Sequence, residues 1–265
     1  MGVMDLPLSA TIVPRLDVLE TAGSTNDELV RRATGPDAAG WPDLAVIVTD
    51  NQTTGRGRLG RSWVSPAGKS LAISVLLRPA ERGSALPIDR FGWFPLLAGL
   101  AMTRAVTTVV PSGATLKWPN DVLIDGRKVC GILSELLPDA SGVVIGAGLN
   151  VSLGEADLPV DTATSLALAG VERPDPDAVL AAYLTELAGL VGDFLSAGGD
   201  AVAGGLVAAV TERCETIGRP VRVELPSGEP LLGTATAIDQ DGRLIVETNT
   251  GITAVAAGDV THLRY

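Results

Sequence analysis

The sequence predicts an α+β protein: a mixed, largely antiparallel sheet with flanking helices, followed by a small C-terminal SH3-like β-barrel. Three patterns support this. Short strand-like runs separated by turn residues recur between 114 and 151, two stretches place apolar residues at helical spacing, and short strands fill the last 45 or so positions. At 265 residues the chain suits one large domain with a small appendage, and we expect units at 1–215 and 216–265.

The elements of the first half follow from periodicity and capping residues. Ser24 to Asp27 offer hydroxyls and early acids, which cap a helix N-terminus. The first ten residues lack any such pattern and are expected to form a loose terminus. The expected strands are 15–20, 44–48 and 71–77, and the expected helices are 28–33 and about 88–110.

The second half begins with an antiparallel meander, because Asp125-Gly126 is a strong hairpin signal. A Pro/Asp-rich segment at 174–177 then precedes an amphipathic helix whose apolar stripe runs from Leu180 to Phe194, and a second helix ends near Cys214. The meander strands are expected at 114–118, 121–125, 128–137 and 142–151. The barrel strands are expected at 221–225, 232–238, 243–248 and 252–256, with turns at Ser227-Gly228 and Asp241-Gly242.

The composition argues against several classes of protein. A net charge of −11 does not suit broad nucleic-acid binding, which needs clustered Lys and Arg. We find no apolar stretch near the ~20 residues of a membrane helix and no signal peptide in the first 15 residues, so we expect a cytoplasmic protein with no membrane association. Cys130 and Cys214 lack metal-ligand or redox spacing and are expected to be buried free thiols.

Residues 55–61, Gly-Arg-Gly-Arg-Leu-Gly-Arg, are the most unusual segment. Their glycines fit the G-x-G-x-x-G dinucleotide fingerprint, but that fingerprint requires a helix to follow it. Here turn residues lead into another strand-like run at 71–77, which argues against a nicotinamide site. We expect a mobile cationic flap between two strands, with Arg56, Arg58 and the loop amides over a phosphate or carboxylate. Its arginines are expected to be unpaired and to repel one another.

A second unusual segment runs from Lys117 to Leu133. It places Lys, Trp, Asn and Asp on one arm of a hairpin and Arg-Lys-x-x-Gly on the other. Gly131 inside a strand indicates close approach by another group. Turn chemistry at Asn120-Asp121, with a solvated Lys128, would explain the hairpin alone equally well.

Six segments in order resemble biotin protein ligases, and the resemblance covers about residues 15–265. Any one segment could be accidental, whereas six with suitable gaps form a strong signal. They are Ser24-Thr25-Asn26, Gln52 to Trp63 around the arginine loop, Ser65-Pro66-x-Gly68, Lys117 to Asp121, Gly126 to Leu133 around Lys128, and Gly146-x-Gly148-x-Asn150.

The resemblance implies a catalytic domain like those of class II aminoacyl-tRNA synthetases and biotin ligases. In this family the biotin carboxylate attacks the α-phosphorus of ATP, giving biotinyl-5′-AMP and pyrophosphate. A lysine of a carboxylase's biotin carboxyl-carrier domain then attacks the mixed anhydride and releases AMP. Biotin, ATP and Mg²⁺ are therefore the expected ligands.

The resemblance also implies roles for individual residues. Lys128 is expected to stabilise the transition state, with Arg56 and Arg58 beside it, and Asp121 is a candidate Mg²⁺ ligand. A cyclic urea has two donors and one acceptor, which suits hydroxyl and amide side chains. The expected biotin residues are Ser24, Thr25, Gln52, Gly55, Arg56, Lys128 and Gly131. The expected nucleotide residues are Arg58, Arg61, Trp63, Lys117, Asn120, Asp121 and Asn150.

Further expectations concern partners and motion. Only 23 residues precede Ser24, too few for the DNA-binding domain of repressor-type relatives, so no DNA binding is expected. The partner is a biotin carboxyl-carrier domain of an acyl-CoA carboxylase, and a weak homodimer is possible within the family. We expect the glycine-rich loop to close after biotin enters and to exclude water from the acyl-adenylate. His262 is expected at the surface, and the carrier lysine has no assignable general base.

Three alternatives remain. A lipoate-type ligase shares the fold and the adenylation chemistry but should lack the Lys117 to Asp121 motif together with this arginine loop. An NAD-dependent oxidoreductase would explain only the glycines. A non-catalytic binding module would explain only the C-terminal barrel.

Overall fold

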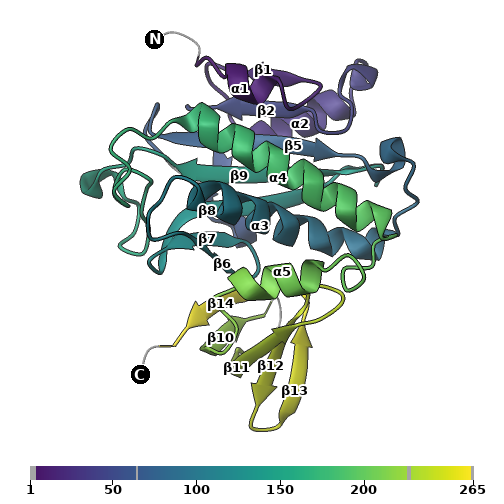
Figure 1. The fold of residues 1–265 in the computed structure, drawn as a ribbon, viewed down its shortest axis with the longest axis vertical. Coiled ribbons are helices and arrows are strands. Elements are labelled where there is room, and N and C mark those ends of the chain that lie inside the picture. Colours follow the sequence, from purple (N-terminus) through teal and green to yellow (C-terminus); the bar gives the residue numbers. More distant parts are fainter. Residues whose placement is uncertain (1–3, 64, 226–227, 264–265) are drawn as a thin grey trace.

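A seven-stranded mixed sheet forms the centre of the protein (Figure 1). The computed structural model describes residues 4–63, 65–225 and 228–263. Only the first two strands in the spatial order pair in parallel, and the other neighbours are antiparallel, which confirms the expected fold class. The order is β1 (Leu16–Val18), β2 (Val46–Thr49), β5 (Ser70–Leu77), β9 (Val143–Asn150), β8 (Arg127–Leu136), β7 (Asp121–Ile124) and β6 (Thr115–Lys117).

Helices cover both faces of this sheet. On one face α3 (Phe94–Thr107) and α4 (Pro176–Ser196) pack side by side over the strands, as Figure 1 shows. On the other face α2 (Thr25–Ala33) packs against β2, β5 and β9. Since side chains alternate along a strand, Val46 and Val48 enter the larger core and Ile47 enters the smaller one under α2. The candidate site lies on the α2 face.

The meander of the second half is confirmed. Strands β6 to β9 pair in sequence as antiparallel neighbours, within one or two residues of the expected bounds. The turn Asp125-Gly126 has both residues at positive φ, +49° and +74°, as a tight hairpin requires. The meander therefore places the second unusual segment, from Lys117 to Leu133, along the sheet edge.

The helical stretch expected from about 88 to 110 is present, but its first residues, Ile88–Trp93, form a 3₁₀ helix, and the α-helix α3 begins at Phe94, because Pro95 fits the first turn of an α-helix. The expectation of a loose terminus was wrong, because the described N-terminal residues contain α1 (Pro7–Ala10). The Asp177 carboxylate accepts hydrogen bonds from the Leu8 and Ser9 amides and from Ser9 Oγ, and these bonds hold α1 on the start of α4.

Helix α4 also corrects the expectation that no stretch is long enough to cross a membrane. Among the described residues α4 is the one helix that is long and apolar enough to span a membrane. It carries Asp177, Glu186 and Asp193, however, and the apolar side chains of Leu184, Leu187 and Phe194 are fully buried. Its contacts with α3 and α1 indicate the core helix of a globular domain.

The C-terminal sheet is antiparallel and SH3-like, with strand order β13-β12-β11-β10-β14. It lies below α5 (Leu206–Arg213) in Figure 1. The sequence missed its last strand, which pairs with β10 and places His262, expected at the surface, in a partly buried position beside Thr216 and Glu215. The turn expected at Ser227-Gly228 lies partly outside the described residues. The strands are β10 (Pro220–Glu224), β11 (Leu231–Ile238), β12 (Leu244–Thr248), β13 (Gly251–Val255) and β14 (Asp259–His262).

Buried tryptophans of the larger unit hold one turn of this sheet. Trp93 Nε1 donates to the Gln240 carbonyl at 2.9 Å, and Trp118 Nε1 donates to the Gly242 carbonyl at 3.0 Å. Arg90 adds an ion pair with Asp241 at 2.9 Å. The two units thus pack against each other, while the division at 215/216 stays a prediction.

Candidate active site

A cavity opens on the α2 face of the sheet, between the N-terminus of α2, strands β5, β8 and β9, and the arginine loop. The cavity brings together nine of the predicted site residues: Ser24, Thr25, Gln52, Arg56, Arg58, Trp63, Asn120, Lys128 and Gly131.

Glycines on the two central strands form the floor of the cavity. Gly131 on β8 and Gly148 on β9 are direct cross-strand partners, and Gly146 lies two residues along β9 and therefore on the same face. A Cβ atom at Gly131 would come within 2.8 Å of Lys128 Nζ, one at Gly146 within 2.5 Å of Asn26 Oδ1, and one at Gly148 within 2.5 Å of the Trp63 ring. These strands therefore lack side chains where the site residues approach most closely.

The α2 N-terminus supplies the polar end of the cavity. Ser24 caps the helix, accepting a hydrogen bond from the Asp27 amide at 3.3 Å, as its sequence position predicted. The Thr25 amide and hydroxyl both donate to Gln52 Oε1, at 2.9 and 3.2 Å. These bonds fix the Gln52 carboxamide with its oxygen towards the helix, which leaves its NH₂ group as the donor for a ligand.

Lys128 lies at the edge of the floor, on β8. Its Nζ contacts Asp121 Oδ1 at 2.5 Å and lies 5.9 Å from the centre of the Trp63 ring. The Lys128 amide donates to the Thr162 carbonyl, and the Lys128 carbonyl accepts from the Thr164 amide. These two hydrogen bonds join the loop at 162–164 to β8. A cation held in this way is the main positive charge on the floor itself.

The arginine loop folds as a small hairpin of its own. Strands β3 (Gly55–Arg56) and β4 (Ser62–Trp63) pair antiparallel, and Arg58–Gly60 form the turn between them. Leu59 and Gly60 have positive φ values of +55° and +73°, so the turn reverses the chain sharply. The loop joins β2 to β5, as predicted, and no helix follows it.

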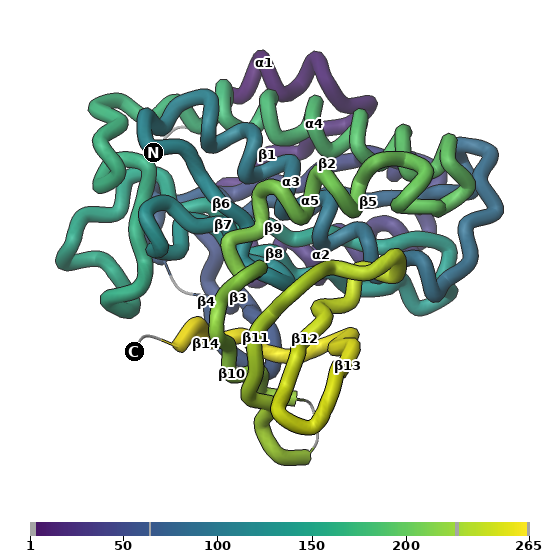
Figure 2. Tube along the Cα trace, turned by 60° about the horizontal axis from the view of Figure 1, so that its bottom comes forward, coloured from purple at the N-terminus to yellow at the C-terminus, as the bar shows by residue number. Residues whose placement is uncertain are grey.

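The expectation that the loop arginines repel one another was wrong, since carboxylates from outside the loop pair with them. Arg56 bonds to Asp27 on α2 and to Glu135 on β8, at 2.9 Å for the latter. Arg61 pairs with Asp259 on β14. Arg58 donates to Asn120 Oδ1 at 3.0 Å and lies 3.8 Å from Asp259. Figure 2 shows β3 and β4 beside β14.

Known proteins with similar sequences match across nearly the whole chain. The model of the biotin/lipoate A/B protein ligase family matches residues 24–150, and the model of the biotin protein ligase C-terminal domain matches 216–263. A biotin–[acetyl-CoA-carboxylase] ligase of Mycobacterium tuberculosis is 39% identical over 254 residues, covering 94% of this chain and 90% of that protein. This chain belongs to the biotin protein ligase family.

Solved structures agree with this assignment. The biotin protein ligase of Aquifex aeolicus in complex with biotin and ATP has a TM-score of 0.75 and 26% identity, covering 95% of this chain and 100% of that one. The Leishmania major ligase in complex with biotinyl-5-AMP has a TM-score of 0.59 and 26% identity, covering 92% and 99%. The enzyme is thus a ligase, and the oxidoreductase and binding-module alternatives are wrong.

Five predicted site residues of the ligase do not line the cavity. Gly55 lies behind Gln52, where a Cβ atom would collide with the Gln52 amide. Asn150 is buried and donates to the Thr164 carbonyl at 2.8 Å, so it holds the loop that bonds to Lys128. Asp121 reaches the site through Lys128, and Arg61 points to Asp259.

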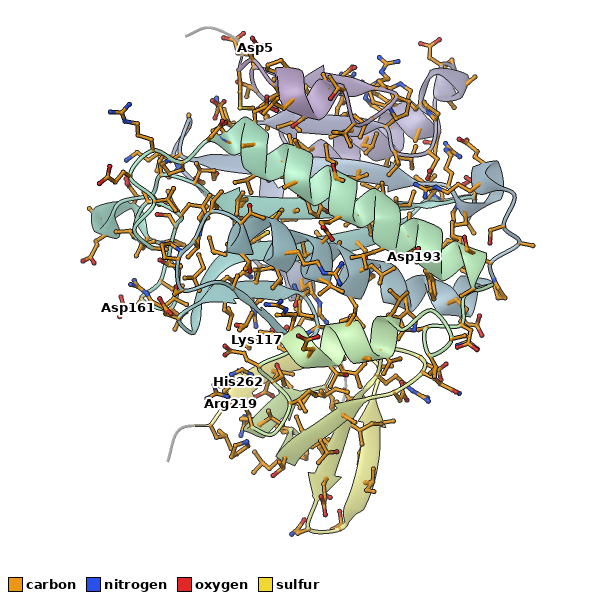
Figure 3. All side chains as sticks on the ribbon, in the orientation of Figure 1. Asp5, Lys117, Asp161, Asp193, Arg219 and His262 are labelled. Atoms are coloured by element: carbon orange, nitrogen blue, oxygen red, sulfur yellow. The ribbon has the colours of Figure 1, made fainter. Side chains whose placement is uncertain are left out.

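Lys117 is the fifth, and it lies where the two units meet, with His262 and Arg219 nearby in Figure 3. Burial lowers the pKa of the Lys117 ammonium, while the carboxylates of Asp121, Asp259 and Glu215 oppose that shift. Burial raises the pKa of the Cys130 thiol to about 12, which fits the expected inert thiol. Cys214 is likewise a buried free thiol, as predicted.

Sequence reasoning missed four residues of the ligase that surround these groups. Asn26 lines the cavity and was quoted in the Ser-Thr-Asn segment without a role. Asp27, Glu135 and Asp259 pair with the loop arginines, and no local pattern marks them. Among the described residues no group of three or more His, Cys, Asp or Glu side chains could hold a metal ion. Mg²⁺ bound with ATP needs only one or two protein carboxylates, so Asp121 stays a predicted ligand.

Proposed function

We propose that the ligase activates biotin with ATP as biotinyl-5′-AMP and then transfers biotin to a lysine in the carrier domain of an acyl-CoA carboxylase. The observation that carries the proposal is the order of groups along one cavity. A hydroxyl and amide end formed by Ser24, Thr25 and Gln52 suits the ureido ring, and a cationic end formed by Lys128 and Arg58 suits a carboxylate and a phosphate.

The first step would place the biotin carboxylate near Lys128. Its oxygen attacks the α-phosphorus, a new oxygen–phosphorus bond forms, and the bond to the pyrophosphate oxygen breaks. Lys128 and Arg58 would stabilise the negative charge that develops on the phosphate. The ATP complex of the Aquifex aeolicus ligase supports ATP as the nucleotide. Mg²⁺ would neutralise the phosphates, with Asp121 as its protein ligand.

The second step would occur at the same place. The amine of the carrier lysine attacks the biotinyl carbonyl carbon, the carbon–oxygen bond to phosphate breaks, and an amide, AMP and a proton form. Lys128 would stabilise the departing phosphate as well. Two findings support this intermediate and this acceptor: the biotinyl-5-AMP complex of the Leishmania major ligase, and the acetyl-CoA-carboxylase in the name of the Mycobacterium tuberculosis relative.

Mass spectrometry provides the test. The purified ligase is incubated with ATP, Mg²⁺ and one acid at a time: biotin, lipoate or octanoate. Biotinyl-5′-AMP should form with biotin alone, and a carrier domain added afterwards should gain the mass of one biotinyl group. Formation of lipoyl-AMP in place of biotinyl-AMP would assign the chain to the lipoate branch, and no adenylate at all would refute the proposed chemistry.

A further inference from the structure

Glu135 has no role in the proposed reaction, although it lies beside the site. Its carboxylate, near the end of β8, accepts hydrogen bonds from two groups of the site. Asn26 Nδ2 donates to Oε2 at 2.7 Å, and Arg56 Nη2 donates to Oε1 at 2.9 Å and to Oε2 at 3.2 Å. The three residues come from α2, β8 and β3, so one carboxylate links three elements.

On one side of Glu135 the contact is rigid. Asn26 is buried, its Oδ1 accepts a 2.6 Å hydrogen bond from Ser74 Oγ, and it lies directly over Gly146. Its Nδ2 also approaches the Leu133 carbonyl at 3.3 Å. Asn26 is therefore fixed in the wall of the cavity by bonds to β5 and β8.

On the other side of Glu135 the contact is exposed and lies on a short element. Arg56 is the last residue of β3, a strand of two residues, and its side chain is 46% exposed. Asp27 and Glu135 are the carboxylates that pair with it. A single exposed ion pair contributes little to stability. The position of the start of the arginine loop therefore depends on both ion pairs of Arg56 forming together.

We propose that Glu135 is a positioning residue that couples the arginine loop to the biotin end of the cavity. By holding Arg56 and Asn26 at once, it makes closure of the loop and ordering of the biotin site a single event. The inference rests on the proposed function, since it concerns retention of biotin and its adenylate. Glu135 does not contact the reacting atoms; it acts through Arg56 and Asn26.

The coupling predicts a specific kinetic pattern. Without the Glu135 carboxylate the loop opens more often, so biotin and the adenylate escape or meet water. In Glu135→Ala, the KM for biotin should rise about tenfold, and bound biotinyl-AMP should hydrolyse about tenfold faster without carrier, the size expected for a lost charge-assisted hydrogen bond. The kcat at saturating biotin should stay within about twofold, because Lys128 and Arg58 are untouched.

The experiment measures the KM for biotin, kcat and the half-life of enzyme-bound biotinyl-AMP in wild type, Glu135→Ala and Glu135→Gln. The glutamine keeps an acceptor oxygen, so its values should fall between the other two. Glu28→Gln is the matched control, a carboxylate on α2 whose partners Arg31 and Arg32 lie outside the cavity, and it should behave as wild type. An unreactive wild type would refute the proposed function, whereas reactive wild type and unchanged Glu135→Ala would refute only the coupling.

A double-mutant cycle separates positioning from a general loss of stability. If Glu135 acts through Arg56, adding Glu135→Ala to Arg56→Ala should change adenylate retention by much less than Glu135→Ala does alone. Effects that multiply independently would overturn the proposal. So would a fall in the KM for biotin, since that result would mean that Glu135 competes with the biotin carboxylate for Arg56.

Discussion

The floor of the cavity and the arginine loop that covers it are held in different ways. The floor belongs to β8 and β9, which pair over seven residues of continuous register above a buried core. The loop is a hairpin of two-residue strands, attached to the rest of the enzyme largely by ion pairs to α2, β8 and β14. Backbone hydrogen bonds between strands hold the floor of the cavity, whereas ion pairs between side chains hold the arginine loop. This difference suits a site that must open to admit biotin and close over a hydrolysable anhydride.

The largest expected effect is loss of the cation on the floor. Lys128→Ala should slow formation of biotinyl-AMP by about 10²–10³-fold, as expected when a group that stabilises developing charge is removed. Single-turnover measurement of the adenylate provides the check. Lys69→Ala is the control, because Lys69 pairs with Asp157 outside the cavity, and it should retain wild-type rates. Near-normal adenylate from Lys128→Ala would remove Lys128 from its proposed role.

A methyl group added to the floor should have the next largest effect. Gly148→Ala places a Cβ atom 2.5 Å from the Trp63 ring, which should displace the ring and raise the KM for biotin by roughly 5- to 150-fold, from an overpacking cost of about 1–3 kcal/mol. Tryptophan fluorescence should change in parallel. Gly189→Ala on α4, where the Cβ would have no neighbour within 4 Å, should instead raise Tm. Unchanged biotin kinetics in Gly148→Ala would mean that the floor is not rigid.

Loss of Asp259, which pairs with the arginine loop from β14, should have a smaller effect than a change in the floor. Asp259→Asn frees Arg61 and weakens the surroundings of Arg58, so the KM for ATP should rise about three- to tenfold, a loss of about 1 kcal/mol typical of one charge pair. The KM for biotin should change little. Glu224→Gln, at the paired position on β10 and bonded to Arg222, controls for disturbance of the barrel. Equal ATP kinetics in both variants would contradict a link between β14 and the loop.

The smallest effect is expected for an ion pair outside the site. The guanidinium groups of Arg31 and Arg32 lower the pKa of Glu28 to about 2 from 4.5. Because the folded pKa lies below the unfolded one, this pairing stabilises the fold above about pH 4.5 and is lost as pH falls towards 2. Thermal melts between pH 7 and pH 2.5 should lose less stability in Glu28→Gln than in wild type, by less than ~1 kcal/mol. An identical pH dependence in the two proteins would contradict this.

Local patterns predicted most of the elements, and they failed where long-range contacts decide. The Asp125-Gly126 hairpin, the Ser24 cap and the stripe on α4 each depend on neighbours a few residues away, and all were expected. Strand β14 was missed because it is short and forms only by pairing with β10. The first ten residues were expected to be loose because the partner of Leu8 and Ser9, Asp177, lies in another part of the chain.

The sequence by itself determined the family, the meander and nine residues of the cavity, because turn chemistry, periodicity and motif order are local properties of a chain. Only the tertiary structure decided how the arginine loop is held. Asn26 and Glu135 are 109 positions apart, and Arg56 and Glu135 are 79 apart. Nothing in the loop itself reveals that its arginines have partners, since an ion pair depends on where the fold brings each charge.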